Sequence, residues 1–288
     1  MKKFNVGDFI FENVSRAMAI SVLVILVTIF YALYDHAKLA IDTLGFGFIT
    51  NTDWAPNVEK FGAFPAIYGT VVSTTIAMVL ATPLALGIAI FLSEIVRGRI
   101  KTIIGTMIEL LAAIPSIVYG MWGLFFFVPL IQKMTGTAGI STLTASIILA
   151  IMIIPFTAAI SRDAMDTTPD ILKESAYALG ATKWDVIKDV IIPFAKIGVI
   201  GSIILSLGRA LGETMAVTFV MGNATRMPSS ILSPATSIPV ILANEFSEAD
   251  GELYYSSLFY LALILFVVSF TVIAIAKFAF LRKVRKNG

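Results

Sequence analysis

Two charged residues, four positions apart, interrupt an apolar run at residues 197–221. The guanidinium of Arg209 presents a planar fork of donors that suits an oxyanion such as phosphate. On a continuous helix Glu213 shares a face with Arg209, so the spacing predicts an ion pair that holds the arginine in place. Two interpretations stay open: an oxyanion site on a transport pathway that the carboxylate keeps near neutral, or an ion pair that only fixes helix register.

Two further polar candidates, Glu109 and Ser116, lie in the apolar run 103–131. Glu109 is close to one end of the run, where we expect an interfacial or interhelical hydrogen bond rather than a place on a pathway. Ser116 follows Pro115, and a proline kink frees a backbone carbonyl beside the hydroxyl. That kink either faces a pathway or only shapes packing, and both residues are kept as candidate pathway residues.

The composition places these residues in a membrane protein. Of 288 residues, 58% are hydrophobic and only 14% are charged, with a mean hydropathy of +0.91. A soluble domain is about one quarter charged. The chain is therefore not an ordinary soluble enzyme or a disordered segment, and we expect a polytopic membrane protein.

Residues for catalysis or metal binding are scarce. The chain has no cysteine and a single histidine, His36, which leaves no thiolate or histidine cluster for a metal. It also has no Gly-x-x-x-x-Gly-Lys-Ser/Thr loop for nucleotide phosphates and no Gly-x-Ser-x-Gly elbow. We expect a chain that is not an enzyme and that holds no metal or cofactor.

Six apolar runs are long enough to cross a bilayer as helices, which needs about 20 residues each. Continuous runs, rather than short alternating strands, exclude a β-barrel. The prediction is an all-α membrane protein, with residues 1–288 forming a single transmembrane domain. The expected spans are residues 17–34, 66–92, 103–131, 140–161, 197–221 and 257–277.

Lysine and arginine gather in alternate loops, so the positive-inside rule places both termini in the cytoplasm. The basic segments are those with Lys2, Lys3 and Arg16; Arg97, Arg99 and Lys101; Arg162, Lys173, Lys183, Lys188 and Lys196; and Lys277, Arg282, Lys283, Arg285 and Lys286. The long loops 35–65 and 222–256 then lie outside. The second is expected to hold a short helix near 240–246, and it is either a docking surface or a solvated connector.

The cytoplasmic loop 162–196 contains strong helix start and stop signals. Thr168 precedes Pro169 and Asp170, which predicts an N-cap with proline at the first helical position. The helix should run through Ala178 and end at Gly180, a residue suited to a left-handed C-cap. A second helix should start at Thr182 with a capping box to Asp185.

Within this loop, Glu174-Ser175-Ala176 is followed by three residues, Gly180, nine residues and Val190-Ile191-Ile192-Pro193. The pattern resembles the EAA loop of ABC-importer permeases, with Ser175 in place of alanine and small changes before Pro193. The resemblance implies the type I ABC-importer permease fold. It also implies that the loop is a cytoplasmic coupling helix, which sits in a groove of a separate ATPase subunit.

Two other stretches, 109–120 and 208–217, resemble phosphate-specific ABC permeases, and the second is closest to the PstC-type subunit. The related PstA-type subunit usually reads Gly-Glu-Thr-Ala-Pro where this chain has Met215-Ala216. The resemblance implies a permease subunit that forms half of an ATP-driven pathway for inorganic phosphate in a prokaryotic cell membrane. In that family the arginine and glutamate at Arg209 and Glu213 matter to phosphate passage.

The resemblance also implies the partners. They are a PstA-type second permease, a PstB-type ATPase dimer that carries ATP and magnesium, and an external PstS-type phosphate-binding protein. Three alternatives remain: a PstA-type subunit, a permease for another oxyanion or nutrient, and a carrier or channel that needs no ATPase. A membrane-embedded enzyme is disfavoured, because no nucleophile and base are paired in the sequence.

Overall fold

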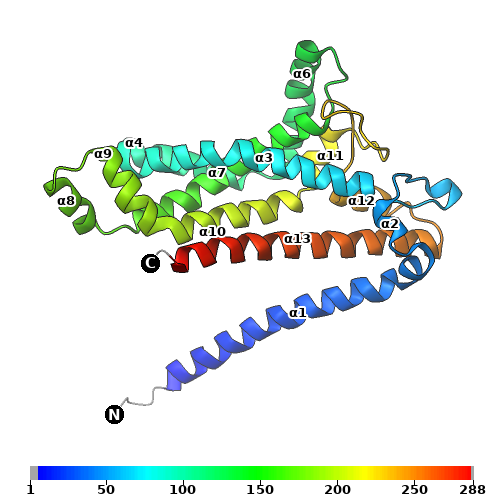
Figure 1. Cartoon of the computed structure of the whole chain (residues 1–288), viewed down its shortest axis with the longest axis horizontal. Helices are drawn as coiled ribbons and strands as arrows, with labels where there is room; N and C mark the ends of the chain where they lie inside the picture. Colours follow the sequence, from blue (N-terminus) through cyan, green and yellow to red (C-terminus); the bar gives the residue numbers. More distant parts are fainter. Residues whose placement is uncertain (1–5, 287–288) are drawn as a thin grey trace.

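The computed structural model describes the backbone of residues 6–286 and the side chains of residue 7 and residues 9–278, and this part is almost entirely helical. The long helices lie roughly along one direction (Figure 1). Six of them are long and apolar enough to cross a membrane, in agreement with the six predicted runs. They span Phe9–Leu44, Phe64–Ile95, Ser116–Thr135, Thr142–Asp166, Lys183–Leu211 and Glu252–Phe278.

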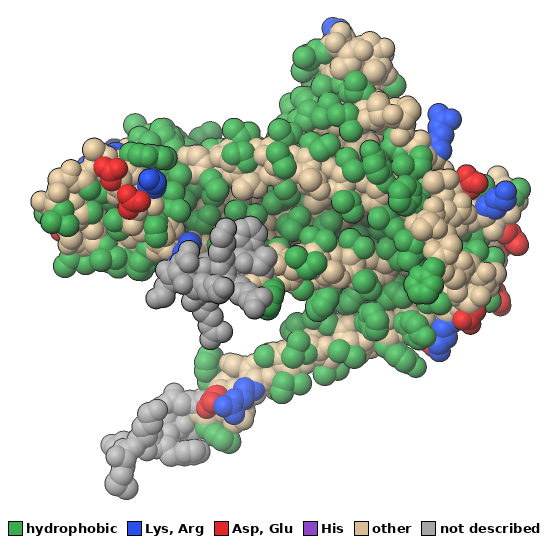
Figure 2. Space-filling view, viewed as in Figure 1, with side chains coloured by type: hydrophobic (Ala, Val, Ile, Leu, Met, Phe, Trp, Pro, Cys, Tyr) green, Lys and Arg blue, Asp and Glu red, His purple; other side chains and the backbone are tan. Residues whose placement is uncertain are grey.

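Charge is concentrated at the two ends of the molecule. Apolar side chains cover the long middle section, whereas acidic and basic side chains gather at either end (Figure 2). We name these ends by their helices. The α8 end carries α8 (Asp170–Ala178) and α9 (Lys183–Asp185), and the α12 end carries α2 (Gly47–Thr50) and α12 (Ile238–Glu245). Lys2 and Lys3 lie outside the described residues, and the four basic side chains after Lys277 lie outside the described side chains.

Three helices form the centre of the bundle: α3 (Phe64–Ile90), α7 (Thr142–Asp166) and α10 (Ile192–Leu211). Small residues on α3 allow the close packing, since Ala77, Ala81 and Ala85 have no exposed surface. Between α7 and α10, hydroxyls pair Thr157 with Ser206 at 2.6 Å and Ser161 with Ser202 at 2.7 Å. Such bonds stabilise membrane helix pairs by about 0.6 kcal/mol each, so α7 and α10 keep one register.

Helix α1 (Val6–Leu44) separates from the bundle toward its N-terminal end (Figure 1). It packs against α13 (Glu252–Lys286) near the α12 end, where His36 stacks on Phe259 with ring centroids 4.6 Å apart. Most of its apolar surface is exposed. The predicted start of the outer loop at residue 35 is wrong, because α1 continues to Leu44.

The predicted span 103–131 is broken. Helix α4 (Gly98–Ala113) ends before Ile114 and Pro115, whose backbones are extended with ψ near 132° and 137°. The chain then continues through α5 (Ser116–Trp122), the π-helical turn η3 (Gly123–Phe127) and α6 (Val128–Thr135). Proline lacks an N–H donor and disfavours a helical residue before it, so only the part after Pro115 forms the span.

The predicted span 197–221 is also interrupted. Helix α10 ends at Leu211, and α11 (Met215–Met221) starts after a break at residues 212–214. On its other side α10 continues from α9 (Lys183–Asp185) through the π-helical turn η4 (Val186–Ile191). The span therefore lies nearer the α8 end than the hydropathy run suggests.

The α12 end is a compact cap. It contains α2 (Gly47–Thr50), the 3-10 turn η1 (Pro56–Val58) and α12 (Ile238–Glu245), and α12 confirms the short helix predicted near 240–246. Phe48 stacks on Tyr260 with ring centroids 4.6 Å apart. The Glu245 carboxylate accepts hydrogen bonds from the Trp54 indole and the Tyr254 hydroxyl, each at 2.7 Å. These contacts tie both long loops to α13.

Candidate functional site

Arg209 lies in the last turn of α10 and is half-buried. Its guanidinium carbon is 5.2 Å from the ring centroid of Phe156 on α7, a cation–π contact. Tyr119 on α5 is close enough to interact electrostatically with the guanidinium. Within the described part of the chain Arg209 has no ion pair or hydrogen-bonded partner, so its N–H donors stay available.

The predicted ion pair between Arg209 and Glu213 is wrong. The i,i+4 relation needs a continuous helix, and α10 ends at Leu211 before Glu213 is reached. Glu213 Oε1 instead accepts a hydrogen bond from the backbone N–H of Ala216, at 3.1 Å. A carboxylate at a helix N-terminus satisfies an unpaired donor there and suits the helix dipole, so Glu213 holds the start of α11.

The two broken helices meet beside Arg209. Helix α5 packs against α11, where a Cβ on Gly120 would come within 2.9 Å of the Ala216 Cα. The Tyr119 hydroxyl donates a 2.9 Å hydrogen bond to the Leu111 carbonyl, which also accepts from the Ile114 N–H at the end of α4. Ser116 starts α5 and is half-buried. In membrane proteins, interrupted helices of this kind are tolerated where they are buried in protein or line a cavity.

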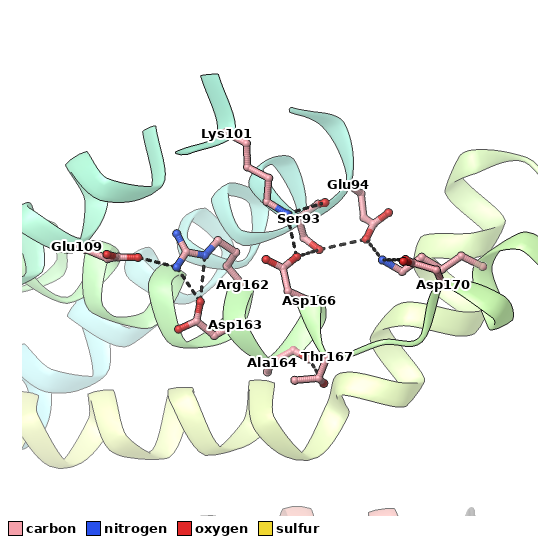
Figure 3. A network of polar contacts seen from close by, with 11 residues as sticks. Ser93, Glu94, Lys101, Glu109, Arg162, Asp163, Ala164, Asp166, Thr167 and Asp170 are labelled. Atoms are coloured by element: carbon pink, nitrogen blue, oxygen red, sulfur yellow. Dashed lines mark hydrogen bonds and ion pairs between the residues drawn. The ribbon is translucent and has the colours of Figure 1, made fainter. Parts of the chain in front are cut away.

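Glu109 makes the interhelical contact that we expected. Its carboxylate accepts a hydrogen bond from Arg162 on α7 at 2.7 Å, and Arg162 also pairs with Asp163 (Figure 3). Gly105 leaves the space for this arrangement, since a Cβ there would lie 2.6 Å from Arg162 Nη1. Glu109 is therefore separate from Arg209 and belongs to the α8 end.

The start of α8 differs from its prediction. The N-cap is Pro169 and α8 runs over Asp170–Ala178, so the first helical residue is Asp170. Thr168 Oγ1 is buried with no hydrogen-bond partner and caps nothing. The extended backbone of Pro169, with ψ near 134°, separates Thr168 from the first turn.

The other signals in the loop are confirmed. Gly180 follows α8 with φ near +86°, the left-handed conformation that glycine adopts without strain. Thr182 and Asp185 form the capping box, with the Thr182 N–H to Asp185 Oδ2 distance at 2.9 Å. Pro193 lies in the first turn of α10.

The outward face of this loop is apolar and exposed. The exposed fractions are 70% for Ile171, 89% for Leu179 and 62% for Trp184. Glu174 and Ser175 are also exposed, whereas Ala176 is half-buried against η4. An exposed group of large apolar side chains beside charged residues is typical of a protein interface.

The described residues contain no group of three or more histidine, cysteine or carboxylate side chains that could hold a metal ion. A cavity of about 210 Å³ near Tyr119 is lined mainly by Ile88, Ile151 and other apolar side chains, which gives an anion no donors.

Sequence reasoning missed Phe156 and Tyr119. An aromatic residue inside an apolar run does not stand out in the sequence, and only the packing of α5 and α7 against α10 shows that both lie near Arg209.

Known proteins of similar sequence and structure fit this architecture. The family model described as "Binding-protein-dependent transport system inner membrane component" matches residues 81–286. "Phosphate transport system permease protein PstC" of Mesorhizobium japonicum is 46% identical, over 100% of this chain and 94% of that protein. The protein of the same name in Pasteurella multocida is 45% identical, over 98% and 94%.

Among solved structures, a chain of a bacterial alginate ABC transporter in complex with a periplasmic protein has a TM-score of 0.65, with 14% identity and 94% of both chains covered. At that identity the similarity shows the fold, which is that of the type I ABC-importer permeases. Because the family model covers more than half of the chain and close relatives match nearly all of it, this chain belongs to the family of inner-membrane components of binding-protein-dependent transport systems.

Proposed function

We propose that this chain is a permease subunit of an ATP-driven importer of inorganic phosphate and that it forms half of the translocation pathway. The substrate follows from the relatives, whose names specify phosphate transport and which match almost the whole chain at 45% and 46% identity. The proposed subunit type is the PstC type.

Arg209 is the observation that carries the proposal. A charged residue at the bilayer centre costs about 2.5–3.5 kcal/mol on insertion scales, so it needs a compensating role. No carboxylate in the described residues neutralises Arg209, and the Phe156 ring supports only one face of the guanidinium. Its donors are left for an oxyanion, which they can bind in a bidentate manner.

The contact between Arg209 and Phe156 would also allow the bound anion to leave. A cation–π contact stabilises a cation by about 0.5–2 kcal/mol, which keeps the side chain in place without occupying its N–H groups. A transport pathway must bind its ion weakly enough to let it leave. A single half-exposed arginine, completed by a second permease across the pathway, meets this requirement. Ser116 remains predicted to line the pathway, and Glu213 would act by holding α11.

The loop 162–196 would supply the energy coupling. We propose that α8 is the coupling helix, with Glu174, Ser175 and Ala176 on it, and that Gly180 and Pro193 set the ends of the segment that docks on an ATPase. The exposed side chains Ile171, Leu179 and Trp184 would enter the contact. ATP and magnesium would then bind to a PstB-type dimer and not to this chain.

The remaining partners and the orientation follow from this arrangement. An ATPase on the α8 end makes that end cytoplasmic, together with the first residues of α1 and the last residues of α13, which lie toward the same end (Figure 1). The α12 end would face outward and receive a PstS-type phosphate-binding protein. A PstA-type permease would complete the pathway in the inner membrane of a prokaryote.

Uptake of labelled anions tests the substrate. In a strain that lacks only this chain, re-expression should restore uptake of phosphate but not of sulfate or molybdate. Restored uptake of another anion, with phosphate uptake unchanged, would make the chain a permease for that anion. Copurification separates an ATP-driven importer from an ion-gradient carrier: the intact chain should bring an ATPase subunit with it, and a carrier would not.

A further inference from the structure

A polar network at the α8 end connects four helical segments (Figure 3). It joins α4, the end of α7, α8 and η2 (Phe91–Ile95), a π-helical turn that continues α3. Its ion pairs are Lys101–Asp166 at 3.1 Å, Arg162–Glu109 at 2.7 Å and Lys173–Glu94 at 2.8 Å. Ser93 Oγ adds a 3.0 Å hydrogen bond to Asp166 Oδ1.

The pair between Lys173 and Glu94 is the most enclosed of these. The two side chains are only 16% and 10% exposed, although the residues lie on the surface of the α8 end. Lys173 points from α8 toward the bundle, whereas the neighbouring Glu174 is exposed. Burial of both partners reduces screening by water and salt, so this pair keeps more of its attraction than an open surface pair.

In the described part of the chain, Lys173–Glu94 is also the one ion pair that joins α8 to η2, the continuation of α3. Backbone joins α8 to α7 on one side and to α9 on the other, and its main packing contact is with η4, which leads into α10. A movement of α8 therefore reaches α7 and α10 through the chain itself. It reaches α3 directly through Lys173 and Glu94.

Helix α3 in turn leads to the arginine. It packs along α7 for most of its length, and Thr74 Oγ1 lies 3.5 Å from the carbonyl oxygen of Ala210, the residue after Arg209. The hydrogen bond from Ser93 to Asp166 keeps the ends of α3 and α7 together. Glu94 thus lies just beyond one end of α3, whose other half contacts Ala210, the residue next to Arg209.

We propose that Lys173 and Glu94 are positioning residues that stay paired and transmit movement of α8 to α3 during transport. The inference rests on the proposed function, since it assumes that an ATPase moves α8. The pair acts as a second mechanical connection beside the covalent one. Without it, movement of α8 would reach α3 only indirectly, through the packing of α3 on α7, and ATP hydrolysis would be less tightly coupled to transport.

The test uses the complete complex in lipid vesicles: this chain, the second permease, the ATPase and the external binding protein. Phosphate uptake and ATP hydrolysis are measured on the same preparation. Lys173→Gln and Glu94→Gln should each raise the number of ATP molecules hydrolysed per phosphate about tenfold, within the range of ordinary coupling energies. The charge-swapped double variant, Glu94→Lys with Lys173→Glu, should restore at least half of the wild-type ratio.

The controls separate this role from others. Lys188→Gln removes an exposed lysine of the same loop that is in none of these ion pairs, and it should leave the ratio unchanged. If the pair only stabilised the fold, breaking it would reduce assembled complex, uptake and hydrolysis together, and the number of ATP molecules hydrolysed per phosphate would stay constant. A lysine that acts on the ATPase surface would not be rescued by the swap. Either result overturns the proposal.

Failure of the proposed function is recognised separately. If wild-type vesicles take up sulfate or molybdate instead of phosphate, the substrate is wrong, and the same ratio is then measured with that anion. If wild-type vesicles transport phosphate normally but the single variants keep the wild-type ratio, the inference about Lys173 and Glu94 is wrong and the proposed function stands.

Discussion

The cations at the α8 end and the cation in the middle of the bundle are held in opposite ways. Lys101, Arg162 and Lys173 each lie 2.7–3.1 Å from a carboxylate on another helical segment. Arg209 has a Phe156 ring in place of a carboxylate. Cations paired with carboxylates have their charge satisfied within the chain and connect helices. An unpaired cation keeps its donors for a mobile anion, so the first group connects helices, whereas the proposed anion contact falls to Arg209.

The largest expected effect is at the unpaired cation. Arg209→Gln should reduce phosphate uptake about 100-fold, because two charge-assisted hydrogen bonds to the anion are worth about 3 kcal/mol. Assembly of the complex, measured by copurification, should be unchanged. Glu213→Gln is the matched control, since its amide oxygen can still accept from the Ala216 N–H. Equal loss in both variants would support the ion-pair interpretation that the structure disfavours.

The second largest effect on uptake is expected in the loop 162–196, which we propose docks on the ATPase. Gly180→Pro should reduce uptake about tenfold, because proline cannot adopt φ near +86° and lacks the N–H that binds the Tyr177 carbonyl at 2.9 Å. Gly136 ends α6 in the same conformation, far from α8. Gly136→Pro should therefore disturb folding to a similar extent without changing ATP hydrolysed per phosphate. Normal uptake by Gly180→Pro would argue against a coupling helix here.

A moderate effect on stability, without an effect on transport, is expected at a paired cation. Arg162→Met should lower the free energy of unfolding by about 1–2 kcal/mol, because Arg162 is mostly buried while Glu109 is half exposed and screened. Uptake per assembled complex should stay within about twofold of wild type. Arg16→Met, which breaks an exposed pair with Glu12, should cost less than about 0.5 kcal/mol. Thermal unfolding in detergent compares the two variants.

The smallest effect is expected on the pH dependence of stability, at Glu245 of the α12 end. Its carboxylate accepts hydrogen bonds from two neutral donors, the Trp54 indole and the Tyr254 hydroxyl. Burial raises its pKa above the ordinary value of 4.5, against the opposing hydrogen bonds from Tyr254 and Trp54. The folded chain then binds this proton more tightly than the unfolded chain, so the contribution of Glu245 to stability is fully present below about pH 4.5 and is lost as pH rises through the raised pKa.

Trp54 fluorescence should report this change during unfolding, since its indole bonds to Glu245. Glu245→Gln should remove this part of the pH dependence, and Asp250→Asn is the exposed control, because Asp250 has no part in the raised pKa of Glu245. A variant with the same pH dependence as wild type would show that Glu245 is not the titrating group.

The sequence predicted the positions of six apolar runs but not their continuity. Hydropathy averages over a window, and neither Ile114 nor Gly212 lowers the average enough to reveal a break. Pro115 did signal a kink, yet whether a proline bends a helix or ends it depends on what packs on either side. The prediction for Glu213 failed for the same reason, because i,i+4 reasoning assumes the helix that the break removes.

Local signals in the loop 162–196 were more reliable. Gly180 and the Thr182–Asp185 box depend on backbone and side-chain atoms a few residues apart, so their sequence spacing nearly defines their geometry. Thr168 was the exception, because the extended Pro169 moved the helix start beyond its reach.

The sequence by itself determined that this protein spans a membrane, where its apolar runs lie, and how its most structured loop starts and stops its helices. These properties depend on composition and short spacing. Only the tertiary structure decided which charges are paired. Glu109 meets Arg162 across 53 positions and Glu94 meets Lys173 across 79, and Arg209 lies beside Phe156 because α7 and α10 pack in one register. Contacts between distant segments depend on how helices pack, and sequence spacing holds no record of that packing.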